Sequence, residues 1–450
     1  MVQSIHVYVM YRIKLLKILV YQMMNLTMQY KSFKRSMNKL SIWRNSQMNQ
    51  STSLKSPIWT KSFNINFFTN FLINLCMYLL IVIIASYTKS EYHASDSVAG
   101  LVTGLFIIGS LIGRFTTGKY VNKIGPKRIL LIGLGFLLVT QLFYFIEGSL
   151  AFLMVTRLVN GIATGITTTA TGTIAAYVTP NDRKSEGISL FSLSLVIGAA
   201  IGPFFGLLLI NSFPIKLLFT ICLLCGIISF IISFFIKLQF EVESNTESKK
   251  QTTQSKKFNI NNYIAKEAVP VAIIMLISGL TYSSILTFLQ FFAQEINLVT
   301  ISSYFFIFYA IASLITRPVA GRLMDQKNEN VVAYPAFIFL IITFLTLSIT
   351  NNGWLLIIAG LCLGAGYGNI SSCMQAIAIK VSPPAKYGIA TSTYFIGLDL
   401  GLGFGPYVLG FFTSAVSYAQ LYAIMAIIVL ITAIIYYFVH GRKVKNLSSF

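Results

Sequence analysis

Residues 114–128 read RFTTGKYVNKIGPKR, and residues 317–325 read RPVAGRLMD. Both stretches begin with an arginine, carry a glycine four positions later and follow that glycine with a basic residue. The matched residues are Arg114, Gly118 and Lys119 in the first stretch, and Arg317, Gly321 and Arg322 in the second. Asn122 stands where the second stretch has Asp325. The two stretches lie 203 positions apart, which is the first sign of an internal repeat.

The same offset relates many other residues whose types are rarely matched by chance. Glycines, prolines and arginines recur at 203 positions without any gap, over four separate apolar segments. The further pairs are Gly161 and Gly364, Gly165 and Gly368, Pro180 and Pro383, Gly198 and Gly401, Gly202 and Gly405, and Pro203 and Pro406. We call two residues that stand 203 positions apart repeat mates. The pattern predicts two halves that are parallel copies of one another.

The composition indicates that this repeat folds in lipid. The 450 residues are 55% hydrophobic and only 10% charged, with a mean hydropathy of +0.74. A soluble domain carries about 25% charged residues. Such a chain has too few polar side chains to cover a surface that faces water.

The apolar runs have the length that a membrane-spanning helix needs, which is about 20 residues. They predict an all-α polytopic membrane protein with twelve transmembrane helices in two parallel-repeated six-helix halves. The expected spans are residues 63–87, 98–118, 129–146, 150–178, 188–211, 216–237, 268–294, 301–321, 332–350, 354–381, 389–412 and 418–440.

The basic residues between the spans predict the topology. Ten Lys and Arg residues, from Arg12 to Lys61, and no acid come before the first expected span, whereas the opposite loops hold only Lys89 and Lys216. Lys and Arg collect on the cytoplasmic side, so we expect a multi-pass plasma-membrane protein with both termini inside. The predicted organisation is an N-terminal extension (1–60), a six-helix bundle (61–238), a cytoplasmic linker (239–266), a second bundle (267–440) and a tail (441–450).

The N-terminal extension has two interpretations that stay open. Its basic and apolar residues fit a helix that lies on an anionic membrane surface. Methionines are also dense in it, so the start codon could be assigned too early, with Met37 or Met48 as the true start.

Two glycine-rich stretches predict close helix contacts. Residues 198–206 read GAAIGPFFG, and residues 397–406 read GLDLGLGFGP. Glycines four apart form a groove for a neighbouring helix, and Pro203 and Pro406 each remove a backbone hydrogen bond and bend the helix. We expect these residues to serve packing, conformational pivoting, or both. Asp325 and its basic neighbours could likewise form a latch between conformations, or could simply set the topology.

Two ionisable residues inside the spans break the repeat. Arg157 has Gly360 as its mate, and Asp399 has Val196. A charge deep in a membrane is a functional candidate by default, and a charge in only one half is hard to explain as framework. We therefore expect Arg157 and Asp399 to take part in proton coupling. The alternative for Asp399 is a hydrogen bond within its own half, to Asn369 or Ser372, since it faces away from Gly397 and Gly401.

Polar and aromatic side chains in the spans are candidates for a substrate cavity. Asn66, Asn70 and Asn74 recur every four residues and so form one stripe, which fits either substrate contact or hydrogen bonding between helices. The other candidates are Tyr282, Gln290 and Asn369.

The chain resembles the major facilitator superfamily over roughly residues 60–440. GKYVNKIGPKR looks like the family's signature between helices 2 and 3, and RLVNGIATG, from Arg157, looks like its fourth-helix motif. GAAIGPFFG is similar to the fifth-helix motif of twelve-span drug–proton antiporters. The usual acid of the loop signature is Asn122 here, and Leu207 replaces the second of two paired glycines. The resemblance implies a cation-coupled exporter, with the fourth-helix arginine associated with proton coupling.

These observations predict a secondary transporter that exports small organic or drug-like solutes by alternating access, coupled to protons. The alternatives are a nutrient or metabolite symporter or uniporter of the same fold, and a membrane sensor that does not transport. We expect a monomer in the bilayer, with no enzymatic activity, cofactor, metal site or nucleic-acid partner. Three scattered histidines and the absence of a phosphate-binding GxxxxGK[ST] loop favour this view.

Overall fold

The computed structural model describes residues 56–146, 148–210, 213–238, 263–412 and 415–447. Residues Pro57–Phe450 form one compact unit. The predictions for the N-terminal extension and for most of the 239–266 linker lie outside the described residues.

Twelve long helices make up the described part of the chain, which contains no β-strand. The first six are α2 (Lys61–Tyr92), α3 (Asp96–Ile124), α4 (Pro126–Leu142), α5 (Leu150–Val178), α6 (Lys184–Ile210) and α7 (Ile215–Ser233). The second six are α8 (Val269–Glu295), α9 (Val299–Gln326), α10 (Asn330–Ser348), α11 (Gly353–Lys380), α12 (Tyr387–Gly410) and α13 (Tyr418–Tyr436). A π-helix (Tyr437–Gly441) and the short α14 (Arg442–Leu447) follow α13.

Helices are the expected solution for such a chain, because in lipid every backbone N–H and C=O must find a partner inside the segment. Eleven of the described helices are long and apolar enough to cross a bilayer. The twelfth long helix, α12, carries Asp399 together with many Gly, Ser and Thr residues. The all-helical, polytopic fold is therefore as predicted.

The helix boundaries repeat at the offset found in the sequence. α3, α5, α6 and α7 begin at residues 96, 150, 184 and 215, and α9, α11, α12 and α13 begin at residues 299, 353, 387 and 418. Each start in the second set lies 203 positions after its counterpart. Packing repeats as well: α2 packs on α6 as α8 packs on α12, and α3 packs on α5 as α9 packs on α11. The prediction of two parallel-repeated six-helix halves is confirmed.

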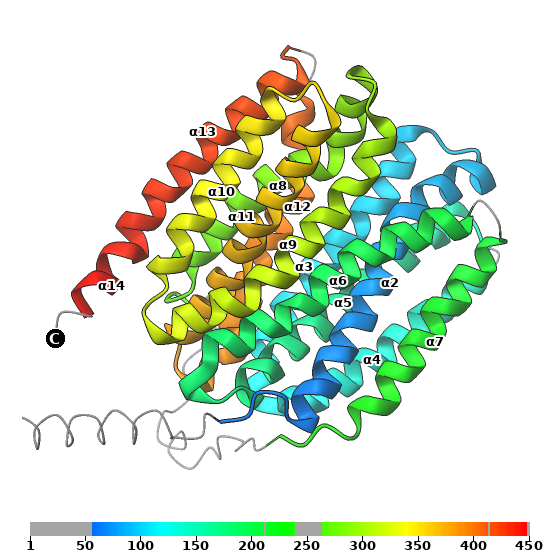
Figure 1. Ribbon diagram of the computed structural model, residues 1–450. Helices are drawn as coiled ribbons and strands as arrows, with labels where there is room; N and C mark the ends of the chain where they lie inside the picture. Colours follow the sequence, from blue (N-terminus) through cyan, green and yellow to red (C-terminus); the bar gives the residue numbers. More distant parts are fainter. Residues whose placement is uncertain (1–55, 147, 211–212, 239–262, 413–414, 448–450) are drawn as a thin grey trace, which may run out of the picture. The chain divides into compact units, whose positions relative to one another are not determined.

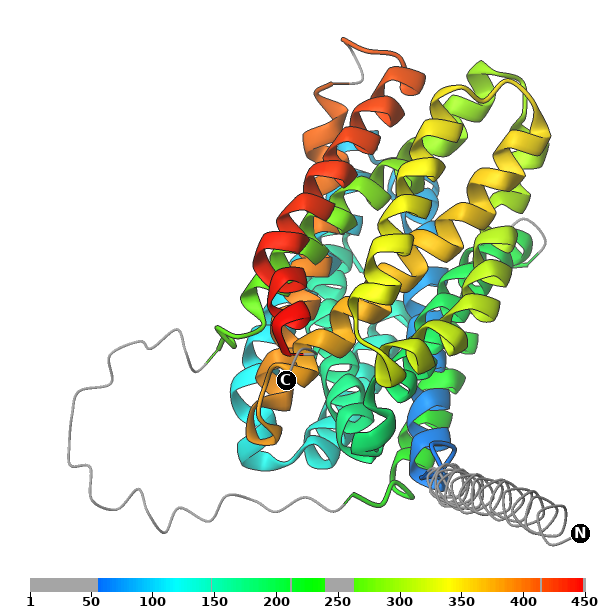
Figure 2. The same cartoon turned by 60° about the vertical axis from the view of Figure 1, so that its left-hand side comes forward.

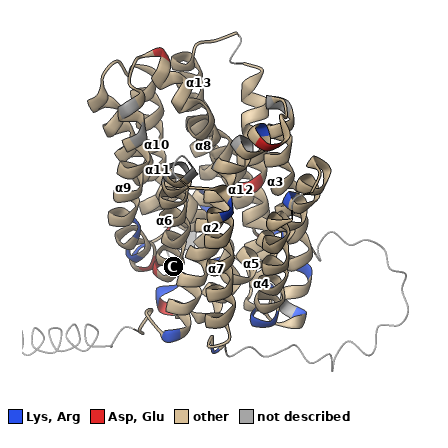
Figure 3. Ribbon diagram, turned by 90° about the vertical axis from the view of Figure 1, so that its right-hand side faces the viewer, with Lys and Arg blue, Asp and Glu red and all other residues tan. Residues whose placement is uncertain are grey.

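The two halves lie side by side, with α2–α7 on the right and α8–α13 on the left of Figure 1. They meet where α3 packs on α12 and where α6 packs on α9. α2 begins and α14 ends toward the same end of the bundle in both views (Figures 1 and 2). α7 ends and α8 begins toward this end as well, and we call it the linker end. Lys and Arg are most frequent at this end (Figure 3).

Glycines let the helices of each half approach closely. A Cβ added at Gly161 of α5 would meet the carbonyl oxygen of Phe106 in α3, and one at Gly364 of α11 would meet the carbonyl oxygen of Tyr309 in α9. Gly161 and Gly364 are repeat mates. Small residues are what permits such contacts when lipid supplies no hydrophobic force between helices.

Gly161→Ala is expected to destabilise the protein, because its methyl group would be forced against the Phe106 backbone. Overpacking of this kind costs about 1–3 kcal/mol. Gly104→Ala is the matched control, since no atom lies within 4 Å of a Cβ at Gly104. The midpoint of thermal unfolding in detergent should fall for Gly161→Ala and hold or rise for Gly104→Ala. Equal midpoints for the two variants would contradict this account of the packing.

Candidate functional site

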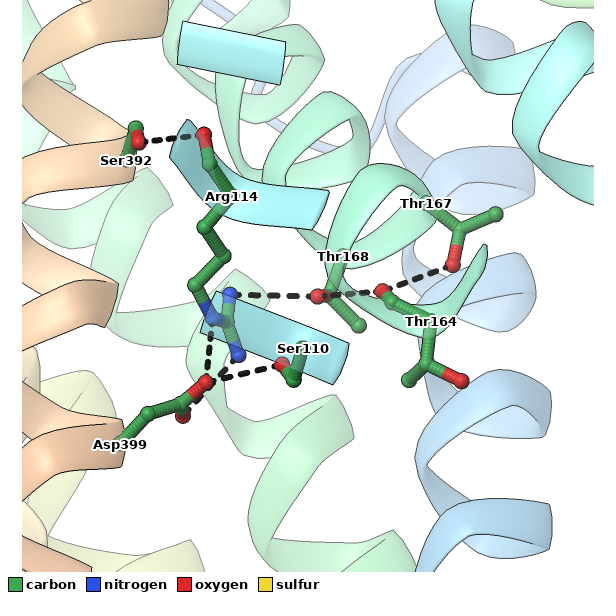
Figure 4. A network of polar contacts seen from close by, with 7 residues as sticks. All are labelled: Ser110, Arg114, Thr164, Thr167, Thr168, Ser392 and Asp399. Carbon is green, nitrogen blue, oxygen red and sulfur yellow. Dashed lines mark hydrogen bonds and ion pairs between the residues drawn. The ribbon is translucent and has the colours of Figure 1, made fainter. Parts of the chain in front are cut away.

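An ion pair joins the two halves (Figure 4). Arg114 of α3 donates from Nε to Asp399 Oδ2 at 2.6 Å and from Nη2 to Asp399 Oδ1 at 3.1 Å. The two side chains are only 6% and 13% exposed. Such a bidentate pair is the strongest kind of side-chain hydrogen bonding, particularly away from water. It connects α3 of the first half to α12 of the second.

Polar neighbours complete the environment of this pair. The Ser110 hydroxyl donates to Asp399 Oδ2 at 2.8 Å, and Arg114 Nη1 lies 3.2 Å from the Thr168 hydroxyl oxygen. The guanidinium lies over the Phe395 ring, 4.4 Å from its centroid. The Ser392 hydroxyl donates to the Arg114 carbonyl at 2.7 Å. The contacts therefore come from α3 and α5 on one side and from α12 on the other.

In this structure Asp399 does not bond to Asn369 or Ser372, the alternative partners within its own half; Ser372 donates to the Asn369 carbonyl at 3.1 Å. Asn369 donates instead to the Thr316 hydroxyl at 3.0 Å and to the Ala365 carbonyl at 2.8 Å. The reason is the orientation of α12. Gly397 and Gly401 pack against the backbone of α8, so Asp399, about half a turn away as the sequence indicates, faces α3 in the other half.

A cavity lies between the halves beside this pair. It is lined by residues of α2 and α6 from the first half and of α8, α9, α11 and α12 from the second. Its volume is about 30 Å³, which is room for one or two water molecules. Arg317 and Ser192 both line it, and Arg317 Nη1 donates to the Ser192 hydroxyl at 2.8 Å.

The structure brings two of the six predicted cavity residues to this cavity, Asn70 and Tyr282. Asn70 Nδ2 donates to the Ser194 hydroxyl at 2.7 Å, and its Oδ1 accepts from the Thr171 hydroxyl at 2.8 Å. Asn70 therefore serves helix–helix bonding and the cavity wall at once. The other four predicted residues do not line the cavity: Asn66, Asn74, Gln290 and Asn369. Asn66 donates to the Thr171 carbonyl and Asn74 donates to the Asn70 carbonyl, while Gln290 is exposed.

Five tyrosines line the cavity, and of these the sequence indicated only Tyr282. Tyr282 stacks on Tyr367 with ring centroids 4.0 Å apart, and on Tyr309 at 6.0 Å. Tyr78 and Tyr394 also line the cavity. These five rings come from five helices, so no spacing within one segment could have revealed them. The chain holds 23 tyrosines, and type alone does not distinguish these.

Arg157 lies apart from the cavity. It is completely buried; its Nη1 lies 3.2 Å from the Tyr144 hydroxyl oxygen, and its guanidinium lies 4.6 Å from the centroid of the Phe106 ring. No carboxylate pairs with it in the described part of the chain. All three residues belong to the first half, so the structure does not bring Arg157 to Asp399.

A second cluster joins the halves at the linker end. Asp325 at the end of α9 accepts hydrogen bonds from the backbone N–H groups of Ser185 (2.9 Å) and Glu186 (2.8 Å) at the start of α6. A carboxylate there is favoured by the helix dipole and by the unpaired N–H groups. Arg322 Nε lies 2.6 Å from Glu186 Oε1, and Lys380 Nζ lies 3.4 Å from Asp325 Oδ1. Residues of the second loop motif, which lies in the second half, therefore bind the start of α6 in the first half.

The motif glycines pack across the same interface. A Cβ at Gly118 would lie 2.8 Å from the Ser392 side chain, and one at Gly321 would lie 3.0 Å from the Ser189 Cβ. Ser189 and Ser392 are repeat mates, so the glycines have equivalent contacts. Lys119 Nζ donates to the Tyr263 hydroxyl at 2.7 Å. The side chain of Asn122 lies outside the described part.

The other predicted helix-packing residues are found inside the helices. Gly198 and Gly202 of α6 pack against Leu75 in α2, while Gly405 of α12 packs against Ser283 in α8. Pro203 and Pro406 lie within α6 and α12. These glycines therefore lie at contacts between helices of one half, and a pivoting role stays a prediction.

Asp399→Asn is expected to destabilise the protein, because it leaves the charge of Arg114 buried without a counter-charge. Removing one member of a buried pair costs about 3–5 kcal/mol. Asp182→Asn is the control, since Asp182 is an exposed acid. The double variant Arg114→Leu/Asp399→Leu should recover much of the loss, as apolar replacements of buried pairs often do. Thermal unfolding in detergent measures all three, and an unchanged midpoint for Asp399→Asn would refute a paired role.

Comparison with known proteins identifies the family. The profile of the Major Facilitator Superfamily matches residues 67–401 and 271–450. The chain is 28% identical over 355 residues to an uncharacterized MFS-type transporter of Methanocaldococcus jannaschii, which covers 76% of this chain and 89% of that protein. It is 23% identical over 338 residues to the multi-drug resistance efflux pump PmrA of Streptococcus pneumoniae serotype 4, covering 73% and 83%.

The fold agrees with a solved member of that family. The crystal structure of the human organic anion transporter MFSD10 (TETRAN) matches with a TM-score of 0.71 at 14% identity, covering 85% of this chain and 100% of that one. This likeness supports the architecture alone. The predicted resemblance, and the prediction of a multi-pass membrane transporter rather than an enzyme, are confirmed. With its two repeated six-helix halves around a central cavity, the chain belongs to the Major Facilitator Superfamily.

Proposed function

We propose that this transporter exports small organic solutes in exchange for protons, by alternating access, from a bacterial-type plasma membrane with both chain ends in the cytoplasm. The concentration of Lys and Arg at the linker end supports that orientation (Figure 3). The similarity to a protein named as a multi-drug efflux pump supports export. We expect the working unit to be a monomer, because the cavity is bounded by two halves of one chain.

The observation that carries the proposal is the ion pair between Arg114 and Asp399. It lies beside the cavity and joins the halves that must separate for access to alternate. When Asp399 takes up a proton, its charge is lost and the pair weakens, which frees Arg114 and loosens α3 from α12. Proton uptake and relative motion of the halves are then linked through one bond.

The cluster around Asp325 supplies the second element of the cycle. It holds α9 to the start of α6 at the linker end, so the cavity is sealed from that side while these bonds last. Opening toward the cytoplasm requires them to break. Through these two clusters, proton binding at Asp399 would be coupled to opening of the linker end.

Arg157 keeps a separate place in the proposal. Its Nε and Nη2 have no hydrogen-bond partner among the described residues, which is costly for a buried cation and argues for a functional reason to retain it. We propose that it assists coupling by stabilising charge within the first half. Asn66, Asn74, Gln290 and Asn369 stay candidates for substrate contact in another conformation.

Inverted membrane vesicles with an imposed pH gradient test the coupling. Acidifying the lumen should drive accumulation of an exported dye, and Asp399→Asn should reduce that accumulation at least about tenfold, because the carrier of the proton is gone. Exchange of labelled for unlabelled dye without a gradient should persist in the variant. Asp182→Asn is the matched control and should behave as the parent.

Other outcomes would reject the proposal in different ways. Exchange that ignores the gradient in the parent protein would indicate a uniporter. Gradient-driven movement in the opposite direction would indicate import by symport. A chain that moves no solute of a broad panel would favour a sensor.

Asp325→Ala is expected to open the linker end. Loss of two hydrogen bonds to a charged group, each contributing about 1.5–3 kcal/mol, should shift the population at least about tenfold. Ala199, which lines the cavity, can be replaced by cysteine in a background without the five native cysteines. Labelling by an impermeant maleimide in inside-out vesicles should increase for Asp325→Ala and stay the same for the exposed control Asp182→Ala. Equal labelling would show that Asp325 is not a latch.

A further inference from the structure

The repeat places two buried arginines in matched surroundings. Arg114 and Arg317 are repeat mates, and each interacts with a hydroxyl group of its own half. Arg114 Nη1 lies 3.2 Å from Thr168 Oγ1, and Arg317 Nη2 lies 3.0 Å from Ser371 Oγ. Thr168 and Ser371 are themselves repeat mates. The two guanidinium groups therefore have equivalent positions within their halves.

The match extends across the interface between the halves. The guanidinium of Arg114 lies over the ring of Phe395 in α12, and that of Arg317 donates to the hydroxyl of Ser192 in α6. Phe395 and Ser192 are again repeat mates. Each arginine thus contacts the same repeat position in the opposite half. Any difference in how the two charges are compensated must therefore come from other neighbouring residues.

One such difference is a missing carboxylate. Asp399 pairs with Arg114, but the mate of Asp399 is Val196. Val196 lies one helical turn from Ser192 and so on the same face of α6. Arg317 is 1% exposed, its Nε has no hydrogen-bond partner, and no ion pair includes it in the described part of the chain. The arginine of the first half thus receives a counter-ion from the second half, whereas Arg317 of the second half receives none from the first.

The open cation belongs to the cavity wall. Arg317 lines the cavity together with Tyr282, Tyr309, Tyr367 and Tyr394. Leaving a cation buried without a counter-charge is expensive unless a ligand provides it. The guanidinium offers two parallel N–H groups that match the two oxygens of a carboxylate, and the tyrosine rings offer flat surfaces to an aromatic group.

We propose that the cavity binds a small aromatic carboxylate, whose acidic group pairs with Arg317 in the place that Asp399 takes beside Arg114. The proposal rests on the transport function above and names its substrate class. Ser313 is the mate of Ser110, whose hydroxyl donates to Asp399; Ser313 donates to the Gly364 carbonyl at 3.3 Å, and in the proposed site it donates to the bound carboxylate as Ser110 does to Asp399. The small volume of the cavity means that the halves must part, and the stacked Tyr282 and Tyr367 separate, to admit the ligand.

Binding of matched probes to the purified full-length protein tests the charge preference. The probes are 2-naphthoate, the neutral 2-naphthalenemethanol and the cationic 2-naphthalenemethylamine, measured by calorimetry and by the shift in thermal unfolding. We expect 2-naphthoate to bind at least about tenfold more tightly than the other two. Equal or weaker binding of the carboxylate would overturn the proposal.

Variants at the two key positions test the assigned place of the carboxylate. Arg317→Gln should weaken 2-naphthoate binding at least about tenfold, and Arg317→Lys should weaken it less, because a charge remains without the planar fork. Val196→Asp would supply an internal counter-ion to Arg317. It should bind 2-naphthoate at least about tenfold more weakly than Val196→Asn, which has nearly the same shape without the charge.

The folded state of the Val196 pair provides an independent check. Val196→Asp should unfold at a higher temperature than Val196→Asn, since only the acid neutralises Arg317. A lower unfolding temperature for Val196→Asp than for Val196→Asn, or equal 2-naphthoate binding by the two variants, would contradict the assignment. If neither Val196 variant can be purified, the Arg317 variants decide the question. The affinity for 2-naphthoate should then fall from the parent protein to Arg317→Lys and further to Arg317→Gln, and any other order would contradict the assignment.

Different results would reject proton-coupled export and the carboxylate site. Gradient-driven export of a neutral or cationic dye, with no preference for 2-naphthoate, would keep proton-coupled export and reject the anion site. Tight binding of 2-naphthoate together with exchange that ignores the pH gradient would keep the site and reject the coupling.

Discussion

A charge inside a membrane protein must be compensated by the protein, by water or by a ligand, because the surrounding lipid cannot solvate it. Arg114 is compensated by Asp399 across the interface of the two halves. This pair holds the two halves together, so the proposed motion of the halves would have to separate the two charges. The neighbouring side chains position this pair: the Thr168 hydroxyl bonds to Arg114, and the guanidinium lies over the ring of Phe395.

The twofold repeat makes the departures from symmetry informative. Gly118 and Gly321 meet equivalent serines, and Thr168 and Ser371 meet equivalent arginines. Against this background, three exchanges stand out: Asn122 for Asp325, Val196 for Asp399, and Gly360 for Arg157. A framework built by duplication has no physical need for them. We propose that these exchanges serve the transport cycle, and both the proposed latch residue Asp325 and the unpaired cation of Arg317 lie on α9 of the second half.

The packing explains how such a bundle can hold its shape and still change state. Within each half, glycines bring backbones into contact, as Gly161 does with Phe106, and close-packed contacts of this kind do not deform gradually. Between the halves, hydrogen bonds and ion pairs accompany the apolar contacts. Bonds such as those of Asp325 to the start of α6 can be exchanged for water or for another partner. Rigid halves joined by exchangeable bonds are what rocking motion requires.

The sequence by itself determined the helical fold, its two copies and the outlying charges. Apolar runs of membrane length and an offset of 203 residues are local or linear properties, which need no coordinates to be read. Partner choice was different: Asp399 and Arg114 lie 285 residues apart, and the tyrosines of the cavity come from separate helices. Only the way in which α3 packs on α12 brings those groups together. Tertiary structure therefore decided which of the buried arginines has a counter-ion, and which one faces an open cavity.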